Sequence, residues 1–181
     1  SYSNDEYLIY GGTGFAKYDL SWNADNVVCC TGFSREDELR ETELFENGYN
    51  CAQSVFATYA PEFGIDFNTA LKLSSSFGGG MGRLREVCGA MSGIFMVLGL
   101  SKGYISPIDM DAKAEHYERV QHLAKEFEKV HGSIICRELL GLDCKSDSYV
   151  PSERTETYYQ TRPCGQFIYD ACEILDKYLQ E

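Results

Sequence analysis

Residues 88–101 read CGAMSGIFMVLGLS, and this stretch decides the fold class. Wound as an α-helix, it is apolar on nearly every side, which is typical of a helix buried inside a protein. It is too short to cross a membrane, which takes about 20 consecutive apolar residues. We therefore expect a buried central helix that ends at Gly103.

Helical patterns continue on both sides of this central helix. A capping-box-like start at Ser34 leads into a stretch that Gly48 ends, and Asp109 introduces the longest helix, which Gly132 caps. The expected helices span residues 34–47, 51–59, 66–77, 88–101, 109–130 and 163–179, with a further short one at 133–140. Residues 143–162 are polar and are expected to form a loop with some local structure. Because no strands intervene, we expect an all-α fold, a compact bundle of about six helices.

The first 33 residues have a different character from the rest. Residues 7–10 and 27–30 are short β-like fragments, each followed by glycine within two residues. We expect residues 1–33 to form an irregular or β-hairpin arm, and residues 34–181 to form the helical, cysteine-containing domain.

The composition of the chain argues against two classes of binding partner. The 181 residues suit one domain and carry a formal net charge of −12, so nucleic acid and anionic membrane surfaces are poor partners. The first six residues have neither the basic region nor the apolar region of a signal peptide. We expect a cytoplasmic protein without a membrane span.

Eight cysteines are the most informative residues, and no two of them form a CxxC or CxxCH motif. A thioredoxin-type motif, a zinc-ribbon knuckle and covalent c-type haem are therefore not indicated. Four cysteines stand at expected helix starts: Cys51, Cys88, Cys136 and Cys164. Any shared chemistry has to be assembled in space from these distant positions.

A helix start suits a reactive thiol. Its free amide N–H groups and partial positive charge stabilise a thiolate, and nearby arginines such as Arg85 and Arg162 add to the effect. Such settings lower a cysteine pKa from about 8.5 to roughly 3.5–7.5. The alternative is that each cysteine is only a small buried hydrophobe.

The glycine run at residues 78–82 (GGGMG) precedes Cys88. It lacks the Lys-Ser/Thr of a phosphate-binding P-loop, so we interpret it as a tight turn that brings backbone amides beside Cys88. Gly79, Gly80 and Gly89 are the candidate cofactor-contacting glycines. Gly89 and Gly93 would let another helix or a cofactor approach the central helix closely.

Five segments together resemble a known family. They read ENGYNCAQSV at 46–55, FGGGMGR at 77–83, CGAMSG at 88–93, GSIICRELLG at 132–141 and RPC at 162–164. The chain resembles, over about residues 40–180, the redox-active proteins named for the C…GCAxxG…C…C signature. The resemblance implies a small helical protein whose signature cysteines are Cys51, Cys88, Cys136 and Cys164. A similar domain occurs in split-Soret cytochromes, where cysteines are associated with an iron–sulfur centre.

Three hypotheses follow for these cysteines. The leading one is that the four thiolates bind a [2Fe–2S] or [4Fe–4S] cluster and pass electrons to a redox partner protein, with a homodimer as a further option. The second is metal-free thiol–disulfide chemistry by the same cysteines, and the third is a structural zinc site in a binding module. The resemblance favours a redox role over zinc. Whether the protein is an enzyme stays open, because no substrate is indicated.

The other candidate residues have smaller expected roles. His131 is the histidine that could serve as a spare ligand or base, because it lies near Cys136 in the sequence. Cys29, Cys30, Cys144 and Cys172 lie outside the signature and are expected to be accessory or local.

Overall fold

The structure is a computed structural model that describes residues 40–180. The expected arm at residues 1–33, the helix start at Ser34 and the pair Cys29-Cys30 lie outside the described residues. Within this described range, eight helices carry the fold: α1 (Arg40–Glu46), α2 (Cys51–Tyr59), α3 (Phe67–Ser74), α5 (Gly89–Lys102), α6 (Met110–His131), α7 (Cys136–Leu139), α8 (Glu156–Thr161) and α9 (Cys164–Gln180). Two 3-10 turns, η1 (Ala60–Phe63) and η2 (Ser75–Phe77), and the short element α4 (Gly78–Met81) connect them.

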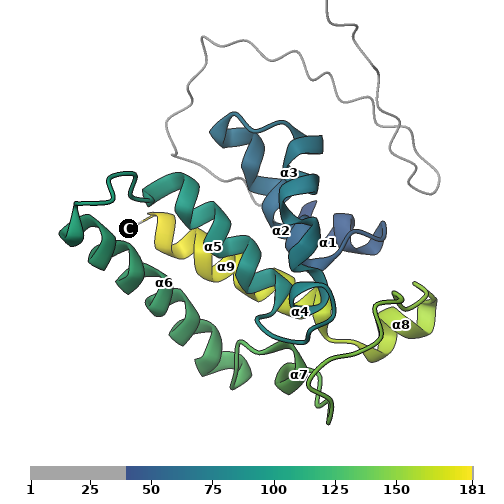
Figure 1. Ribbon diagram of the computed structural model, residues 1–181. Coiled ribbons are helices and arrows are strands. Elements are labelled where there is room, and N and C mark those ends of the chain that lie inside the picture. The colour runs from purple at the N-terminus through teal and green to yellow at the C-terminus, as the bar shows by residue number, and fades with distance from the viewer. Residues whose placement is uncertain (1–39, 181) are drawn as a thin grey trace, which may run out of the picture. The chain divides into compact units, whose positions relative to one another are not determined.

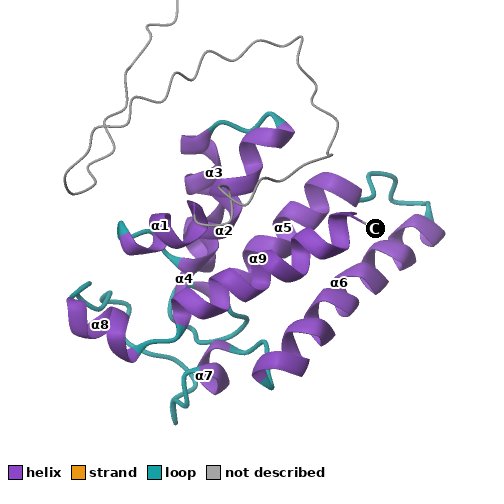
Figure 2. Ribbon diagram, turned by 180° about the vertical axis from the view of Figure 1, so that it is seen from behind, coloured by secondary structure: helices purple, strands orange, loops and turns teal. Residues whose placement is uncertain are grey.

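The all-α prediction is confirmed, because residues 40–180 contain helices and no strand (Figure 2). One isolated antiparallel bridge joins Val87 to Ile135. The expected helices are all represented, and α8 is the local structure in the stretch expected to be a polar loop. Within residues 40–180, no helix is both long enough and apolar enough to cross a lipid bilayer.

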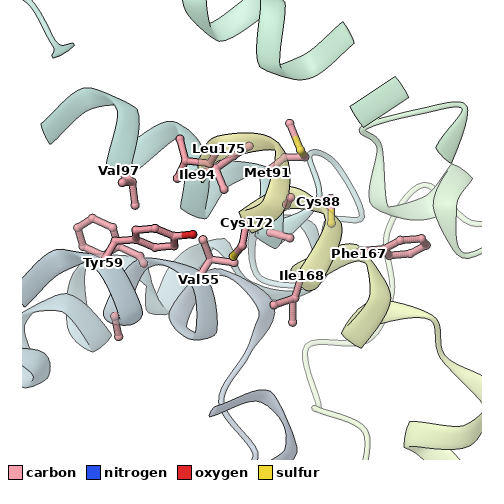
Figure 3. Close-up of a cluster of buried hydrophobic side chains, with 14 of the residues drawn as sticks. Val55, Tyr59, Cys88, Met91, Ile94, Val97, Phe167, Ile168, Cys172 and Leu175 are labelled. Carbon is pink, nitrogen blue, oxygen red and sulfur yellow. The ribbon is translucent and has the colours of Figure 1, made fainter. Parts of the chain in front are cut away.

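Helix α5 is the central buried helix, as expected from its sequence. It runs beside α9, and α6 lies along the outside of this pair (Figure 1). Apolar side chains of α5 meet those of α2 and α9 in the core (Figure 3). The residues that form this contact are Val55 and Tyr59 from α2, Met91, Ile94 and Val97 from α5, and Ile168, Cys172 and Leu175 from α9.

Two glycines of α5 let α2 pack close to it. A Cβ atom added at Gly93 would lie 2.7 Å from the Cβ of Val55, and one added at Gly89 would lie 3.1 Å from the Cβ of Cys51. Any larger side chain at Gly93 would push the two helices apart, because real Cβ atoms do not approach this closely. Gly89 therefore sets Cys51 against the first turn of α5.

Local signals fix where the helices begin. Asn50 caps α2 in a capping box, because its side chain accepts hydrogen bonds from the amides of Ala52 and Gln53 and the Gln53 side chain accepts from the Asn50 amide. The Asn50 side chain also donates to the Ser75 carbonyl, which ties this helix start to the segment before the glycine run. The first residue of α2, Cys51, is thereby held in place.

Candidate functional site

The structure brings the four predicted cysteines together around one cavity. A cavity of about 310 Å³ is lined by Cys51, Cys88, Cys136 and Cys164. Cys51 is the first residue of α2, Cys136 the first of α7 and Cys164 the first of α9, and Cys88 is the N-cap of α5. The elements α4, α7 and the start of α9 lie at the same end of the bundle (Figure 1). Cys88, Cys136 and Cys164 are buried, and Cys51 is half-buried.

Backbone hydrogen bonds fix Cys88 and Cys136 beside each other. The Cys88 amide donates to the Ile134 carbonyl at 2.8 Å, and the Cys136 amide donates to the Glu86 carbonyl at 2.6 Å. These bonds flank the Val87–Ile135 bridge. A short antiparallel pairing therefore places the starts of α5 and α7 on the same wall of the cavity.

The glycine run forms a left-handed turn. Residues 79–83 all have φ between 64° and 69°, so α4 is not a regular right-handed helix. This conformation costs an L-residue about 1–2 kcal/mol, and glycine adopts it freely. Three of the five residues are glycine, and the exceptions are Met81 and Arg83. The prediction of a tight turn is confirmed. The turn packs against Cys136 as well as against the start of α5.

Gly80 is the point of closest approach in this turn. A Cβ atom added at Gly80 would lie 2.6 Å from the Cβ of Cys136 and 2.9 Å from the Glu86 nitrogen. Gly79, Gly80 and Gly89, the candidate cofactor-contacting glycines, all line the cavity. Their lack of side chains leaves space at the wall between the thiols.

Burial has the largest effect on the pKa of two of the cavity thiols, Cys88 and Cys136. Burial raises the pKa of Cys88 to about 12, although the first-turn amides at Ala90 and Met91 act in the opposite direction. Burial also raises the pKa of Cys136, against the hydrogen bond and charge of Arg85. The expectation that helix starts and arginines lower these pKa values is therefore wrong for Cys88 and Cys136, since loss of hydration outweighs both effects.

The pKa of Cys164 is lowered, as expected, but its main cause was not predicted. A hydrogen bond with the Cys51 thiol lowers the pKa of Cys164 to about 7, and the charges of Arg162, Arg154 and Arg85 act in the same direction. The same hydrogen bond raises the pKa of Cys51 well above its usual value, so the expectation of a lowered pKa is also wrong for Cys51. Of the four cavity thiols, Cys164 is thus the one that ionises first.

Two arginines connect the cavity to the segment after α7. Buried Arg85 places Nη1 3.7 Å from the Cys136 sulfur and Nη2 2.8 Å from a carboxylate oxygen of Asp147. Arg83 binds the same oxygen at 2.6 Å, and it also donates to the Ser148 carbonyl and the Ser152 hydroxyl. Hydrogen bonds from Arg85 and Arg83 lower the pKa of Asp147 to about 2. We call residues 147–152, held in this way, the strap.

The sequence did not single out several residues that line the cavity. They come from the strap and from α8 and its flanks: Tyr149, Pro151, Ser152, Arg154 and Tyr158. Nothing in the spacing of these residues marks them, since the stretch 143–162 is polar throughout. Their nearest sequence signal is the concentration of arginine and tyrosine within residues 149–162.

The remaining candidates lie elsewhere. His131 does not line the cavity; its Nε2 lies 2.9 Å from the Asp170 carboxylate, and its ring packs against Phe127 and Phe167. The structure therefore does not bring His131 to the thiols as a spare ligand or base. Cys172 lies buried in the core (Figure 3), and half-buried Cys144 is also outside the cavity lining.

Metal binding makes a geometric demand on the cavity thiols. In the part of the chain that the structure describes, no group of three or more His, Cys, Asp or Glu side chains is placed to hold a metal ion. The positions of the thiols therefore confirm neither the structural zinc site nor the iron–sulfur cluster. The chemistry of the donors fits both kinds of centre, because four cysteine thiolates can bind one zinc ion or one iron–sulfur cluster.

The comparison with protein families decides the class. The family described as "Putative redox-active protein (C_GCAxxG_C_C)" matches residues 49–178, which include all four cavity cysteines. The chain belongs to this family. No curated protein and no solved structure matches the chain. Membership in the C_GCAxxG_C_C family supports a redox role, and the cavity is where the family's four cysteines meet in this chain.

Proposed function

We propose that Cys51, Cys88, Cys136 and Cys164 hold an iron–sulfur cluster and that the protein transfers electrons. The observation that carries this proposal is that all four signature thiols, from four separate segments, line one cavity of about 310 Å³. A disulfide-exchange site needs two cysteines, whereas [2Fe–2S] and [4Fe–4S] clusters are both held by four. When bound, such a cluster would supply one-electron transfer to and from a partner redox protein.

The chain contributes groups that suit an electron-rich sulfur site. The amides of Ala90 and Met91 favour the ionised form of Cys88, and Arg85 does the same for Cys136. Donors and positive charge around cluster sulfurs raise a reduction potential, because they stabilise the added electron. The strap and the left-handed turn supply the buried surroundings of these thiols.

Metal binding at this site has to displace protons. The thiols of Cys88, Cys136 and Cys51 all have raised pKa values, so at neutral pH they are protonated in the metal-free protein. Only thiolates bind metal, so cluster assembly releases these protons and becomes more favourable as the pH rises.

The test is a set of serine substitutions assayed after anaerobic cluster assembly. We expect Cys51→Ser, Cys88→Ser, Cys136→Ser and Cys164→Ser each to lower the bound iron and the visible charge-transfer absorption. Cys144→Ser is the matched control, because Cys144 is a half-buried cysteine outside the cavity. Equal iron in all five variants, or an equal loss in the control, would refute the assignment.

A second function, metal-free thiol–disulfide exchange, is favoured by the Cys51–Cys164 hydrogen bond. The Cys164 thiolate would attack a disulfide of a partner and form a mixed disulfide, releasing one partner thiolate. Cys51, after losing its proton, would attack the Cys164 sulfur of that mixed disulfide and release the second partner thiolate. The partner disulfide is thereby reduced by two electrons and the Cys51–Cys164 pair is oxidised. Thiol counts that are equal in reduced and oxidised samples of the metal-free protein would exclude this function.

A further inference from the structure

The wall of the cysteine cavity is positively charged, in contrast to the chain as a whole. The chain has a formal net charge of −12, yet four arginines line the cavity: Arg83, Arg85, Arg154 and Arg162. Among the described residues that line it, none is an aspartate or a glutamate. Such a concentration of one sign of charge in a cleft attracts ions of the opposite sign.

Two of these arginines already have a carboxylate partner. Arg83 and Arg85 share Asp147 and hold the strap. The Asp147 carboxylate therefore offsets part of the positive charge of Arg83 and Arg85, and the two ion pairs explain how these side chains are placed.

Arg154 and Arg162 are different, because neither forms an ion pair with any residue in the described range 40–180. Their guanidinium carbons lie 4.6 Å and 4.9 Å from the centre of the same ring, that of Tyr158. Two like charges beside one ring repel each other, and no carboxylate within this range forms an ion pair with either of them. Both charges also act on Cys164.

Arg154 is held in place and still has donors to offer. Its Nη2 donates to the Tyr49 carbonyl at 3.2 Å, and its guanidinium also stacks 4.7 Å from the centre of the Phe45 ring. Its Nη1 has no hydrogen-bond partner in the described part of the chain. The side chain of Arg162 makes no hydrogen bond there either, so its fork of N–H groups is available for a ligand.

We propose that this side of the cavity binds a small oxyanion, held by Arg154 and Arg162 next to Cys164. The guanidinium fork matches the paired oxygens of a carboxylate or of a tetrahedral oxyanion. Cys164 opens α9, a 17-residue helix whose N-terminal amides favour a negative ligand. This inference goes beyond electron transfer, because it gives the redox site a binding place for an anionic substrate.

A competing explanation is that these arginines only offset the negative charge of the cavity thiolates. That explanation predicts no anion affinity once the thiolates are bound to a metal cluster. The two explanations therefore differ in whether the cluster-loaded protein binds an added anion.

Calorimetric titration with sulfate, phosphate and acetate tests the proposal. The full chain would be used, both metal-free and reduced, and after anaerobic cluster assembly, at constant ionic strength set with chloride. We expect saturable binding by both forms, and a loss of affinity of about tenfold or more in Arg154→Gln and in Arg162→Gln, since each variant loses a charge-assisted hydrogen bond to the anion. Preference for sulfate and phosphate or for acetate distinguishes a tetrahedral oxyanion from a carboxylate.

Arg119→Gln is the matched control. Arg119 lies on α6, pairs with Glu115 and does not line the cavity, so its removal should leave the affinity unchanged. The proposal is overturned if no anion binds saturably, if the cluster-loaded form does not bind, or if all three variants bind like the wild type. Should Arg154→Gln fail to fold, Arg162→Gln decides, because its side chain makes no hydrogen bond within residues 40–180. Anion binding by a protein that takes up no iron would leave this inference standing and refute the proposed cluster.

Discussion

Gly80 determines how closely the left-handed turn can approach Cys136. A Cβ atom here would lie 2.6 Å from the Cβ of Cys136, and the φ of 68° is itself unfavourable for alanine. We expect Gly80→Ala to lower the free energy of unfolding by about 3 kcal/mol, from overlap and backbone strain together. Urea denaturation of the metal-free protein followed by circular dichroism measures this change.

Gly141 offers a control that separates the steric overlap of an added Cβ atom from the backbone strain of a positive φ. It has a similar φ of 61°, but an added Cβ would meet nothing within 4 Å. Gly141→Ala should therefore lower the free energy of unfolding only through backbone strain at its positive φ, by about 1 kcal/mol. If the two substitutions have the same effect, the close contact between the turn and Cys136 is not present in solution.

The four cavity thiols should differ in reactivity. In reduced, metal-free protein we expect iodoacetamide to modify Cys164 first, with a rate that rises through pH 7, because its pKa is about 7 and the thiolate is the nucleophile. Cys88 should react more slowly than Cys164, because burial raises its pKa to about 12. Peptide mapping by mass spectrometry across pH 5–9 gives the order. Modification of Cys88 as early as Cys164 would contradict the assigned environments.

Among the elements, the close packing of α2 against α5 depends on Gly93 as well as on Gly89. A side chain at Gly93 would collide with Val55, so Gly93→Ala should destabilise the protein by about 1–3 kcal/mol. Gly99 lies on the same helix, and an added Cβ there would meet nothing within 4 Å. Gly99→Ala should instead stabilise by up to about 1 kcal/mol, since alanine has the higher helix propensity. Thermal unfolding of both variants tests whether the two substitutions change the stability in opposite directions.

The strap is held at the cavity by Asp147. The folded-state pKa of Asp147 is lowered to about 2, so its ion pairs contribute above the unfolded pKa of about 4 and are lost as the pH falls through about 2. We expect Asp147→Asn at neutral pH to increase hydrogen exchange of residues 147–152. Asp143→Asn, at an exposed aspartate of the same stretch, should leave that exchange unchanged. Equal exchange in both variants would show that the two arginines do not hold the strap.

At the level of the whole molecule, local patterns predicted the helices well. Leu123 and Phe127, apolar residues four positions apart on α6, are fully buried, which agrees with the spacing of one face of a helix. The cavity cysteines could also be singled out, because helix-start signals and the family signature coincide at each. These features are encoded within a few residues of sequence.

What the sequence could not reveal depends on contacts between distant residues. Arg83 and Asp147 are 64 positions apart, and Arg85 and Cys136 are 51 positions apart. No spacing rule connects such pairs, so the strap and the arginine-lined wall emerge only from the packed chain. The raised pKa of Cys88 has the same origin, because burial is a property of the fold and not of the helix start.

The central claim is that the four cavity thiols hold an iron–sulfur cluster, and the most direct measurement is the iron and acid-labile sulfide content of the full chain isolated without oxygen. Our account predicts iron and sulfide in equal amounts, two or four of each per chain, with a brown colour. A colourless protein without iron, whose cysteines are recovered as free thiols or disulfides, would contradict it.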